Sequence, residues 1–207
     1  VISDSDVLVE PHYLRETVTP LVDSTVGVVT CLYRGVPGGG IWSLLEALGM
    51  SVEMSSGVLV ANLLEGMKFA LGPGMATRRD VLEKIGGIGQ LADYCSDDFL
   101  LGNWAERAGY KVVLSHHVIN HVTVNRSFTD SLQHQVRWMR STRFSRPKGH
   151  LGSGLTFSAP FALLGGMSGV LLGQPSLGAA LFLVGYLNRV AQSVAVGWGI
   201  LRDRNAL

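Results

Sequence analysis

The sequence predicts an α/β fold with a mostly parallel sheet, followed by helices that enter a membrane. Two observations predict it. Apolar, β-branched segments of strand length alternate with segments of helical periodicity through residues 1–126, as in α/β proteins. Two long apolar runs then follow each other, with a single charged residue between positions 149 and 201.

The strands and helices of the first part are expected in alternation. Val26–Tyr33 is β-branched and apolar enough for a buried strand, and Lys111–Leu114 has the same character. The other expected strands are residues 1–3, 7–9 and 69–77, and the expected helices are residues 11–22, 41–67 with a break near 55–57, 78–85, 96–108 and 127–143.

Two of these helices carry clear N-terminal signals. Ser96 is placed to cap the helix 96–108. Ser127 and Asp130 form a pair like a capping box at the start of the helix 127–143. These signals fix where the two helices begin.

Two apolar runs at the C-terminal end are predicted to enter a membrane. Gly152–Gly173 has 22 residues without a charge, long enough to cross about 30 Å of hydrocarbon, and is expected to span or re-enter the membrane; a buried hairpin of a soluble protein is the alternative. Leu177–Leu201 is interrupted only by Arg189, which costs about 2.5–3.5 kcal/mol at the bilayer centre and is expected to face other helices or the interface. Five basic residues in 137–148 precede the first run and place that end in the cytoplasm.

The charges divide the chain in two. Residues 1–130 contain 15 Asp or Glu and 9 Lys or Arg, whereas residues 131–202 contain seven Lys or Arg and no acid. A net charge of +1 argues against a nucleic-acid partner along the whole chain, and 47% hydrophobic residues exclude a disordered chain. With Cys31 and Cys95 as the only cysteines, a disulfide scaffold is excluded and reduced, cytosol-facing thiols are predicted.

Asp4 and Asp6 are the first candidate site residues. They follow a strand end, where α/β proteins bind ligands, and hard carboxylate oxygens hold Mg²⁺ or Mn²⁺, which in turn binds a diphosphate. The alternative is a solvated acidic turn.

Asp97 and Asp98 are the second candidates. The dipole of the helix that follows is expected to keep both carboxylates ionised, and an ionised carboxylate in a cleft serves as a general base. The alternative is helix capping alone.

His134, Arg137 and Trp138 are the third candidates. They stand at i, i+3 and i+4 and therefore share one helix face. An Arg beside a Trp can bind phosphate and flank a sugar or lipid, while the alternative is an interfacial helix with its arginines on lipid headgroups. The nearby histidines at 116, 117 and 121 are expected to decorate a strand end and loop, with an extra metal or phosphate ligand as the alternative.

The order of these features is more specific than any one of them. Asp4-Ser5-Asp6 comes first, then the glycine-rich segment 72–76, the pair Asp97-Asp98, the Arg137-Trp138 helix and the apolar runs. In this order the sequence resembles the inverting, processive-type family 2 glycosyltransferases. It is most similar to their membrane-bound ceramide glucosyltransferase branch and to the related bacterial hopanoid glycosyltransferases, over nearly the whole chain.

The resemblance implies a fold and a domain organisation. A GT-A-like, Rossmann-type catalytic domain is expected in residues 1–126, a basic interfacial helix with the RW motif in 127–150, and about two membrane segments in 151–207. Because the chain opens on the tail of a strand, we expect a fragment whose N-terminal part, with the aspartate that contacts uracil, is missing.

The resemblance also implies roles in the acidic part. Asp4 and Asp6 fall on the aspartates that bind Mg²⁺ or Mn²⁺ and, through it, the nucleotide diphosphate. Asp98 falls on the catalytic base, and Asp97 stands beside it on the acceptor side.

In the basic part, three residues fall on the (Q/R)xxRW motif. Arg137 is expected to contact the diphosphate and Trp138 the acceptor. His134 departs from the usual Gln or Arg, although its ring can still donate to a phosphate.

The reaction implied is transfer of a sugar from a UDP-sugar to the hydroxyl of a ceramide- or hopanoid-like lipid, with inversion. A multi-pass membrane protein is expected, with its catalytic face in the cytoplasm, in a bacterial inner membrane or a Golgi-type membrane. The alternatives are a processive polysaccharide synthase of the same fold and a non-catalytic, membrane-anchored module.

Overall fold

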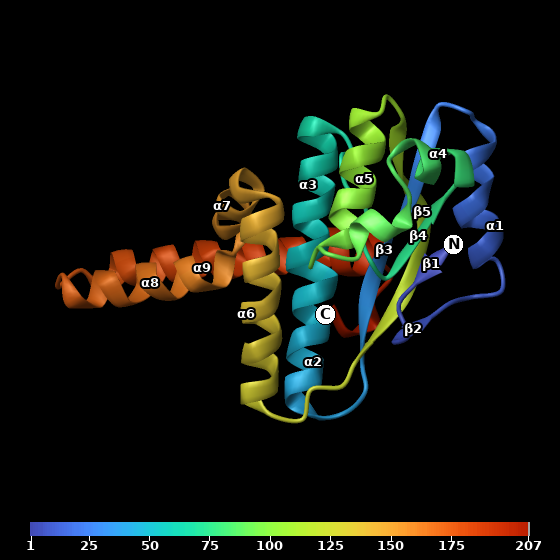
Figure 1. Ribbon diagram of the computed structural model, residues 1–207. Coiled ribbons are helices and arrows are strands. Elements are labelled where there is room, and N and C mark those ends of the chain that lie inside the picture. Colours follow the sequence, from blue (N-terminus) through green and yellow to red (C-terminus); the bar gives the residue numbers. More distant parts are fainter. Residues whose placement is uncertain (207) are drawn as a thin grey trace.

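Five strands form one mixed sheet in the computed structural model, which describes residues 1–206 (Figure 1). The strands are β1 (Ile2–Ser3), β2 (Val7–Leu8), β3 (Val26–Pro37), β4 (Gly74–Thr77) and β5 (Lys111–Thr123), in the order β1-β4-β3-β5-β2. β3 and β5 are parallel, and the other pairs among these strands are antiparallel. The α/β class is confirmed, whereas the strand directions correct the expected mostly parallel sheet.

The central pair β3–β5 is longer than the sequence predicted. The first half of β3 is made of apolar and β-branched residues and is buried, with Val28, Val29 and Cys31 fully so. β5 continues past Leu114 because it follows β3 to the end of that strand, after a register shift at Cys31/Leu32. The second half of β5 contains polar and histidine side chains, so its hydrophobic pattern did not predict a strand there.

Helices cover both faces of the sheet (Figure 1). On one face lies α1 (Tyr13–Val18), followed by the 3₁₀ turn Thr19–Val22. On the other lie α2 (Gly40–Gly49), the π-helical turn η2 (Met50–Met54), α3 (Ser55–Glu65) and α5 (Asp97–Arg107). The shorter connecting helices are α4 (Arg79–Lys84) and the 3₁₀ helix η3 (Ile88–Leu91).

The stretch α2–η2–α3 is one continuous helix, so the expected break near residues 55–57 is wrong. Its irregular part is the π-helical turn just before that point, which packs closely on β3. The N–H of Gly35 donates to Oγ of Ser51 at 3.0 Å, and a Cβ on Gly35 would lie 2.4 Å from Cα of Ala47. Only glycine allows this approach between strand and helix.

The C-terminal helices are α6 (Phe128–Ser145), α7 (Pro147–Thr156), α8 (Ser158–Leu171), α9 (Pro175–Gln192), the π-helical η4 (Ser193–Ile200) and η5 (Arg204–Ala206). The run Gly152–Gly173 is therefore not a single crossing helix, because it is interrupted at Phe157. Pro160 accounts for the interruption, since a proline clashes with the carbonyl four residues earlier and lacks the N–H of a continuous helix. α8 alone has 14 residues, about 21 Å of helix.

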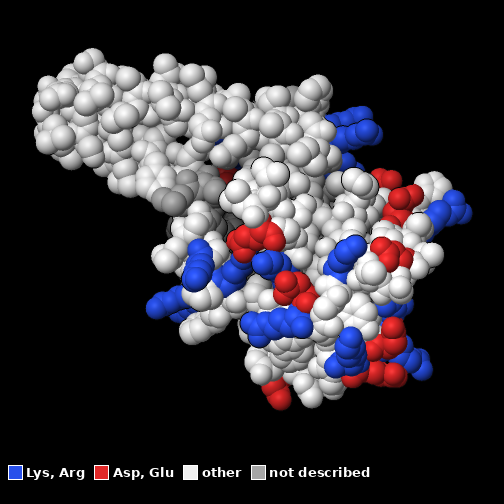
Figure 2. Space-filling model, turned by 90° about the horizontal axis from the view of Figure 1, so that it is seen from above, with Lys and Arg blue, Asp and Glu red and all other residues white. Residues whose placement is uncertain are grey.

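α8 and α9 form a hairpin that projects from the sheet domain (Figure 1). Glycines bring the two helices together: a Cβ on Gly169 would lie 2.3 Å from Cα of Gly178, and one on Gly185 would lie 2.5 Å from Cβ of Ala162. Packing on small residues is typical of helices in membranes. Figure 2 shows the hairpin as an arm without coloured charged residues, beside a domain that carries both signs.

Two helices among the described residues are long and apolar enough to cross a membrane. One is Gly40–Glu65, half of which is buried against the sheet domain, and the other is Pro175–Ile200. The latter ends on the sheet domain, where Leu201 is fully buried in the same hydrophobic core as Leu101. Arg189, expected to face helices or the interface, pairs with Glu53 of η2 at 3.0 Å.

Candidate active site

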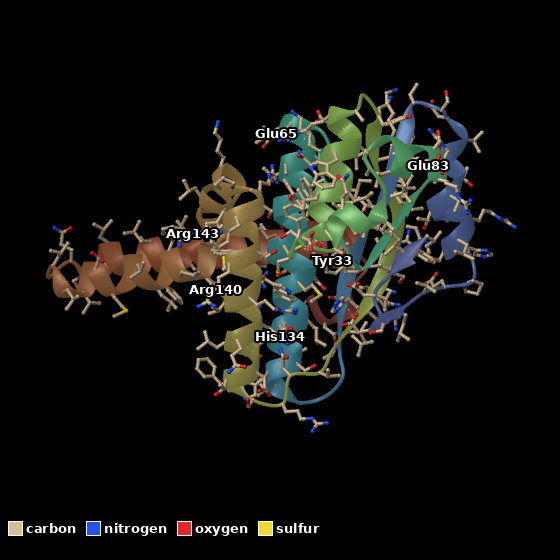
Figure 3. All side chains as sticks on the ribbon, viewed as in Figure 1. Tyr33, Glu65, Glu83, His134, Arg140 and Arg143 are labelled. Atoms are coloured by element: carbon tan, nitrogen blue, oxygen red, sulfur yellow. The ribbon has the colours of Figure 1, made fainter. Side chains whose placement is uncertain are left out.

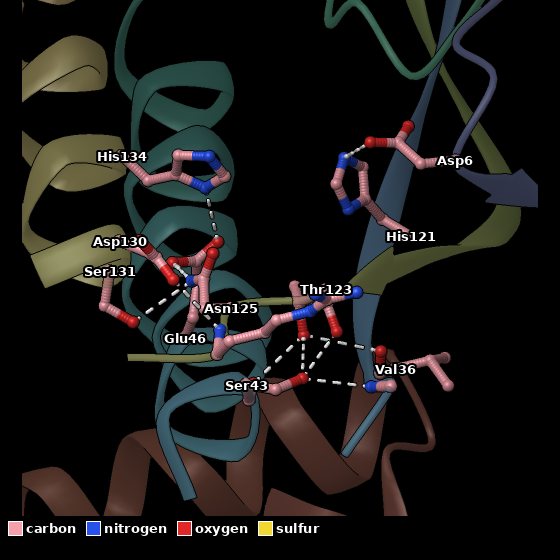
Figure 4. Close-up of polar contacts among 12 residues, drawn as sticks. Asp6, Val36, Ser43, Glu46, His121, Thr123, Asn125, Asp130, Ser131 and His134 are labelled. Carbon is pink, nitrogen blue, oxygen red and sulfur yellow. Dashed lines mark hydrogen bonds and ion pairs between the residues drawn. The ribbon is translucent and has the colours of Figure 1, made fainter. Parts of the chain in front are cut away.

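Asp4, Asp6 and His121 form the centre of an acidic site at one end of the sheet. Asp4 and Asp6 lie in the turn between β1 and β2, and His121 comes from β5, where it is the register partner of Val7. One potential ligand atom from each of the three residues lies within 4.8 Å of the others. Nε2 of His121 lies 3.6 Å from Oδ2 of Asp6. Figure 4 shows the two side chains facing each other.

The electrostatics of this cluster suit a cation. Burial and the neighbouring Asp6 raise the pKa of the Asp4 carboxyl above its ordinary value, whereas His121 lowers it. Nε2 of His121 is the ring nitrogen that faces Asp6, so it is the one available to a cation held by the two carboxylates. Carboxylates suit Mg²⁺ or Mn²⁺, and imidazole is a common ligand of transition metals, so the donor set fits a divalent cation.

Asp98 lies beside this cluster at the start of α5. Its Oδ2 accepts from the N–H of Gly72 at 2.8 Å, and its Oδ1 accepts from the N–H of Phe99 at 2.7 Å. A Cβ added to Gly72 would lie 3.3 Å from Oδ2 of Asp98 and 3.6 Å from Oδ2 of Asp4. The two carboxyl groups therefore face the same glycine.

Burial raises the pKa of the Asp98 carboxyl, and the charges of Asp97 and Asp4 raise it further, against the lowering effect of the two N–H donors. Desolvation is the largest effect and outweighs the two N–H donors, so the pKa of Asp98 lies above the ordinary value of an aspartate. A carboxyl with a raised pKa is a stronger base once it is ionised, which suits proton abstraction.

Ser96 and Asp97 complete the start of α5. Ser96 is the N-cap residue of α5, as predicted, but its side chain makes no cap hydrogen bond and instead bonds to Oγ of Ser141 on α6. Asp97 is exposed and close enough to raise the pKa of both Asp4 and Asp98. Four candidate aspartates are therefore brought together.

Tyr33 on β3 lies next to the acidic cluster. Its ring centroid is 5.5 Å from that of His121. Burial raises the pKa of the Tyr33 hydroxyl, and the charges of Asp98 and Asp4 raise it further. The hydroxyl therefore stays protonated and available as a donor toward the acidic site.

The candidates on α6 form a second group. Arg137 is exposed and Trp138 is half-buried, and no hydrogen bond or ion pair joins either to the four aspartates among the described residues. His134, Arg140 and Arg143 lie on the same helix (Figure 3). The capping box at the start of α6 is confirmed, because the N–H of Asp130 donates to Oγ of Ser127 at 3.1 Å.

A cavity of about 1030 Å³ lies between α5 and α6. Its walls combine the guanidinium groups of Arg107, Arg137 and Arg140 with aromatic and aliphatic side chains. Those apolar lining residues are Tyr94, Phe99, Leu100, Trp104, Leu132, Val136 and Phe144. The cavity therefore lies between α5 and the basic face of α6, and none of the four candidate aspartates lines it.

Residues 1–205 match the family described as glycosyl transferase family 21. The chain belongs to this family. Family 21 is the ceramide glucosyltransferase family, so the predicted relationship to ceramide glucosyltransferases is confirmed, under number 21 rather than 2. The hopanoid branch remains a prediction. No curated protein matches the sequence.

Three polar residues that lie beside the candidate site residues were not predicted from the sequence to do so. His121 was expected on a strand end or loop, yet it lies within β5, and only the register with β2 brings it to Asp6. Tyr33 belonged to an apolar strand pattern and carried no signal of its own. Glu46 stood in an apolar helical stretch, although its side chain is 4% exposed and contacts His134.

Proposed function

We propose that this family 21 protein transfers a sugar from a UDP-sugar to the hydroxyl of a ceramide- or hopanoid-like lipid, with inversion at the anomeric carbon. The observation that carries the proposal is the position of Asp98. Its half-buried carboxyl, held by two backbone N–H groups, faces the same glycine as Asp4 of the candidate metal cluster. The proposed base thus lies beside the residues that would hold the cation and, through it, the diphosphate.

Asp4, Asp6 and His121 are the residues that would hold the divalent cation. When bound, Mg²⁺ or Mn²⁺ supplies positive charge to the diphosphate of the donor. The grouping of one potential ligand atom from each of these residues within 4.8 Å supports this role, with Nε2 of His121 as the ring nitrogen that faces Asp6.

The chemistry is a single displacement. The acceptor hydroxyl gives its proton to Asp98, its oxygen forms the new bond to the anomeric carbon, and the bond from that carbon to the diphosphate breaks. UDP leaves with the electron pair of that bond, and Arg137 is the guanidinium proposed to stabilise its charge. Attack from the face opposite the diphosphate turns an α-linked donor into a β-linked product.

The shape of the molecule supports a lipid acceptor. Figure 1 shows α6 running across the direction in which α8 and α9 project, so a bilayer that receives the hairpin meets α6 along its length. Leu132, Val136 and Phe144 of α6 are exposed, between basic residues that suit anionic headgroups. The active site would then lie on the cytoplasmic surface, where a soluble donor and a membrane lipid meet.

The experiment that tests this function is mass spectrometry of lipids from cells that express the full-length protein. The wild type is expected to produce a lipid heavier by one hexose or N-acetylhexosamine, and Asp98→Asn is expected to abolish it. Glu83→Gln, an exposed carboxylate on α4, is the matched control and should leave the product unchanged.

Three outcomes contradict the proposal. A product with a long sugar chain favours the processive polysaccharide synthase, and the absence of any product from the wild type favours a non-catalytic module. Unchanged product from Asp98→Asn, in a protein expressed at wild-type level, removes Asp98 from the role of base.

A further inference from the structure

A polar cluster outside the acidic site connects α6 to the sheet domain. Its centre is Glu46 of α2, whose side chain is 4% exposed. Oε1 of Glu46 lies 3.3 Å from Nδ1 of His134, and the amide of Asn125 donates to Oε2 (Figure 4). The same amide donates to Oγ of Ser131 at 3.1 Å. A carboxyl group this buried is costly unless its oxygens are hydrogen-bonded, and these partners supply the bonds.

The cluster is anchored at the end of β5. Oγ1 of Thr123 donates to the carbonyl of Ser43 on α2 at 3.0 Å, and Oγ of Ser43 is hydrogen-bonded to the carbonyl of Thr123 in return. Asn125 follows two residues later and is itself 4% exposed. Glu46 therefore sits on a fixed base made by α2 and the end of the strand.

By contrast, α6 is held weakly by packing. None of its described residues is buried, and Leu132 and Val136 expose their apolar side chains. Its ring contact with α2 joins Phe128 to Trp42, with centroids 5.3 Å apart, at the first turn. Since burial does not fix this helix, its polar contacts have a large share in setting its position.

The contact to Glu46 is made by the helix face that carries the RW pair. His134, Arg137 and Trp138 are spaced at i, i+3 and i+4, and the rings of His134 and Trp138 are 6.2 Å apart. A rotation or shift of His134 relative to α2 therefore moves Arg137 as well.

We propose that Glu46 is a positioning residue for sugar transfer, which holds Nδ1 of His134 and thereby fixes the α6 face that carries Arg137 and Trp138. This inference rests on the proposed function of the site. Glu46 touches no reacting group and acts through His134. Because its carboxyl requires an N–H donor from α6, a glutamine at position 134 can replace the histidine, whereas a leucine cannot.

The first test is steady-state kinetics of sugar transfer with full-length variants of unchanged thermal midpoint. Glu46→Gln is expected to lower kcat about ten- to a hundred-fold, since a small misplacement of a transition-state contact has such effects, with a much smaller change in KM for the donor. His134→Leu should reproduce this loss, and His134→Gln should retain most of the activity. Glu83→Gln, with the same chemical change on an exposed residue, should match the wild type.

The double variant Glu46→Gln/His134→Leu shows whether the two residues act together. If Glu46 acts through His134, the double variant is no slower than His134→Leu alone. Additive losses, or wild-type kcat in Glu46→Gln, overturn the inference while leaving the proposed function intact.

The second test does not depend on activity. In ¹⁵N spectra of histidine-labelled protein, the resonances of His134, assigned by their loss in His134→Gln, should show a proton on Nδ1. In Glu46→Gln the proton on Nδ1 should lose its dominance, while the other histidines stay unchanged. If the wild type transfers no sugar, the proposed function fails, and the contact between Glu46 and His134 is then tested by this spectrum alone. A proton that stays on Nδ1 in Glu46→Gln refutes the contact.

Discussion

The N–H of Gly72 donates to Oδ2 of Asp98 at 2.8 Å, and this bond ties the loop before β4 to the first turn of α5. Two segments that are 26 residues apart in the chain thus share one carboxyl group. The same glycine has no side chain between Asp98 and Asp4, so the candidate base and the candidate metal ligand face each other across backbone. The properties of this carboxyl lead to the first prediction.

The pH dependence of sugar transfer is expected to have an acid limb above the ordinary range of an aspartate. Asp98 accepts a proton only when ionised, and burial raises its pKa in the folded protein, so activity is present above that raised pKa and is lost as the pH falls through it. Asp97→Asn removes a charge that raises the pKa of Asp98, and should move the limb to lower pH. The measurement is kcat/KM against pH for both proteins; a limb that does not move, or moves upward, contradicts the assignment.

His121 is predicted to bind the divalent cation together with Asp4 and Asp6. His121→Ala should weaken Mn²⁺ binding about ten-fold or more, because one of three clustered ligands is removed. Titration of Mn²⁺ followed by electron paramagnetic resonance measures the affinity without any substrate. His116→Ala, an exposed histidine on the same strand, is the control and should bind Mn²⁺ as the wild type does. Equal affinity in the two variants would exclude His121 from the site.

Much of the acidic site could be predicted because its residues follow one another in a fixed order along the chain. Asp4, Asp6 and Asp98 needed only strand ends and a helix start to be recognised. His121 could not be assigned in this way, since the register of an antiparallel edge pair decides which of the nearby histidines meets Asp6.

The C-terminal part shows the other limit of the sequence. Hydropathy predicted an apolar segment correctly, but it does not respond to Pro160, which splits Gly152–Gly173 into two helices. The ion pair of Arg189 with Glu53 could not be predicted either. Glu53 lies more than a hundred residues earlier, in a stretch whose pattern indicated only an apolar helix.

Gly102→Ala is predicted to destabilise the fold. Gly102 lies on the buried side of α5, and a Cβ there would lie 2.3 Å from N of Ala70 and 2.4 Å from the carbonyl carbon of Phe69. Backbone atoms cannot move aside as a flexible side chain does, so α5 must shift from the segment that leads to Gly72. We expect a loss of about 1–3 kcal/mol in the free energy of unfolding and a matching loss of activity.

Gly57→Ala is the matched control for this change, because Gly57 is also helical and its added Cβ meets nothing within 4 Å. It should stabilise the protein by about 0.5–1 kcal/mol through helix propensity. Thermal or denaturant unfolding of both variants measures the difference. Equal stabilities of the two variants would show that α5 does not press on the segment before Gly72.

The tip of the α8–α9 hairpin is predicted to enter the bilayer. Leu172 at the tip is 76% exposed, and no charged residue lies between Lys148 and Arg189. Insertion of the tip therefore removes apolar surface from water without desolvating a charge. An environment-sensitive fluorophore on Leu172→Cys, in a Cys95→Ser background that leaves only the buried Cys31, should shift its emission to the blue when lipid vesicles are added. The same label on Val22→Cys, an exposed apolar position on the sheet domain, should not respond. If both labels stay in water in the presence of vesicles, the hairpin does not insert, and the proposal of a lipid acceptor loses its support from the structure.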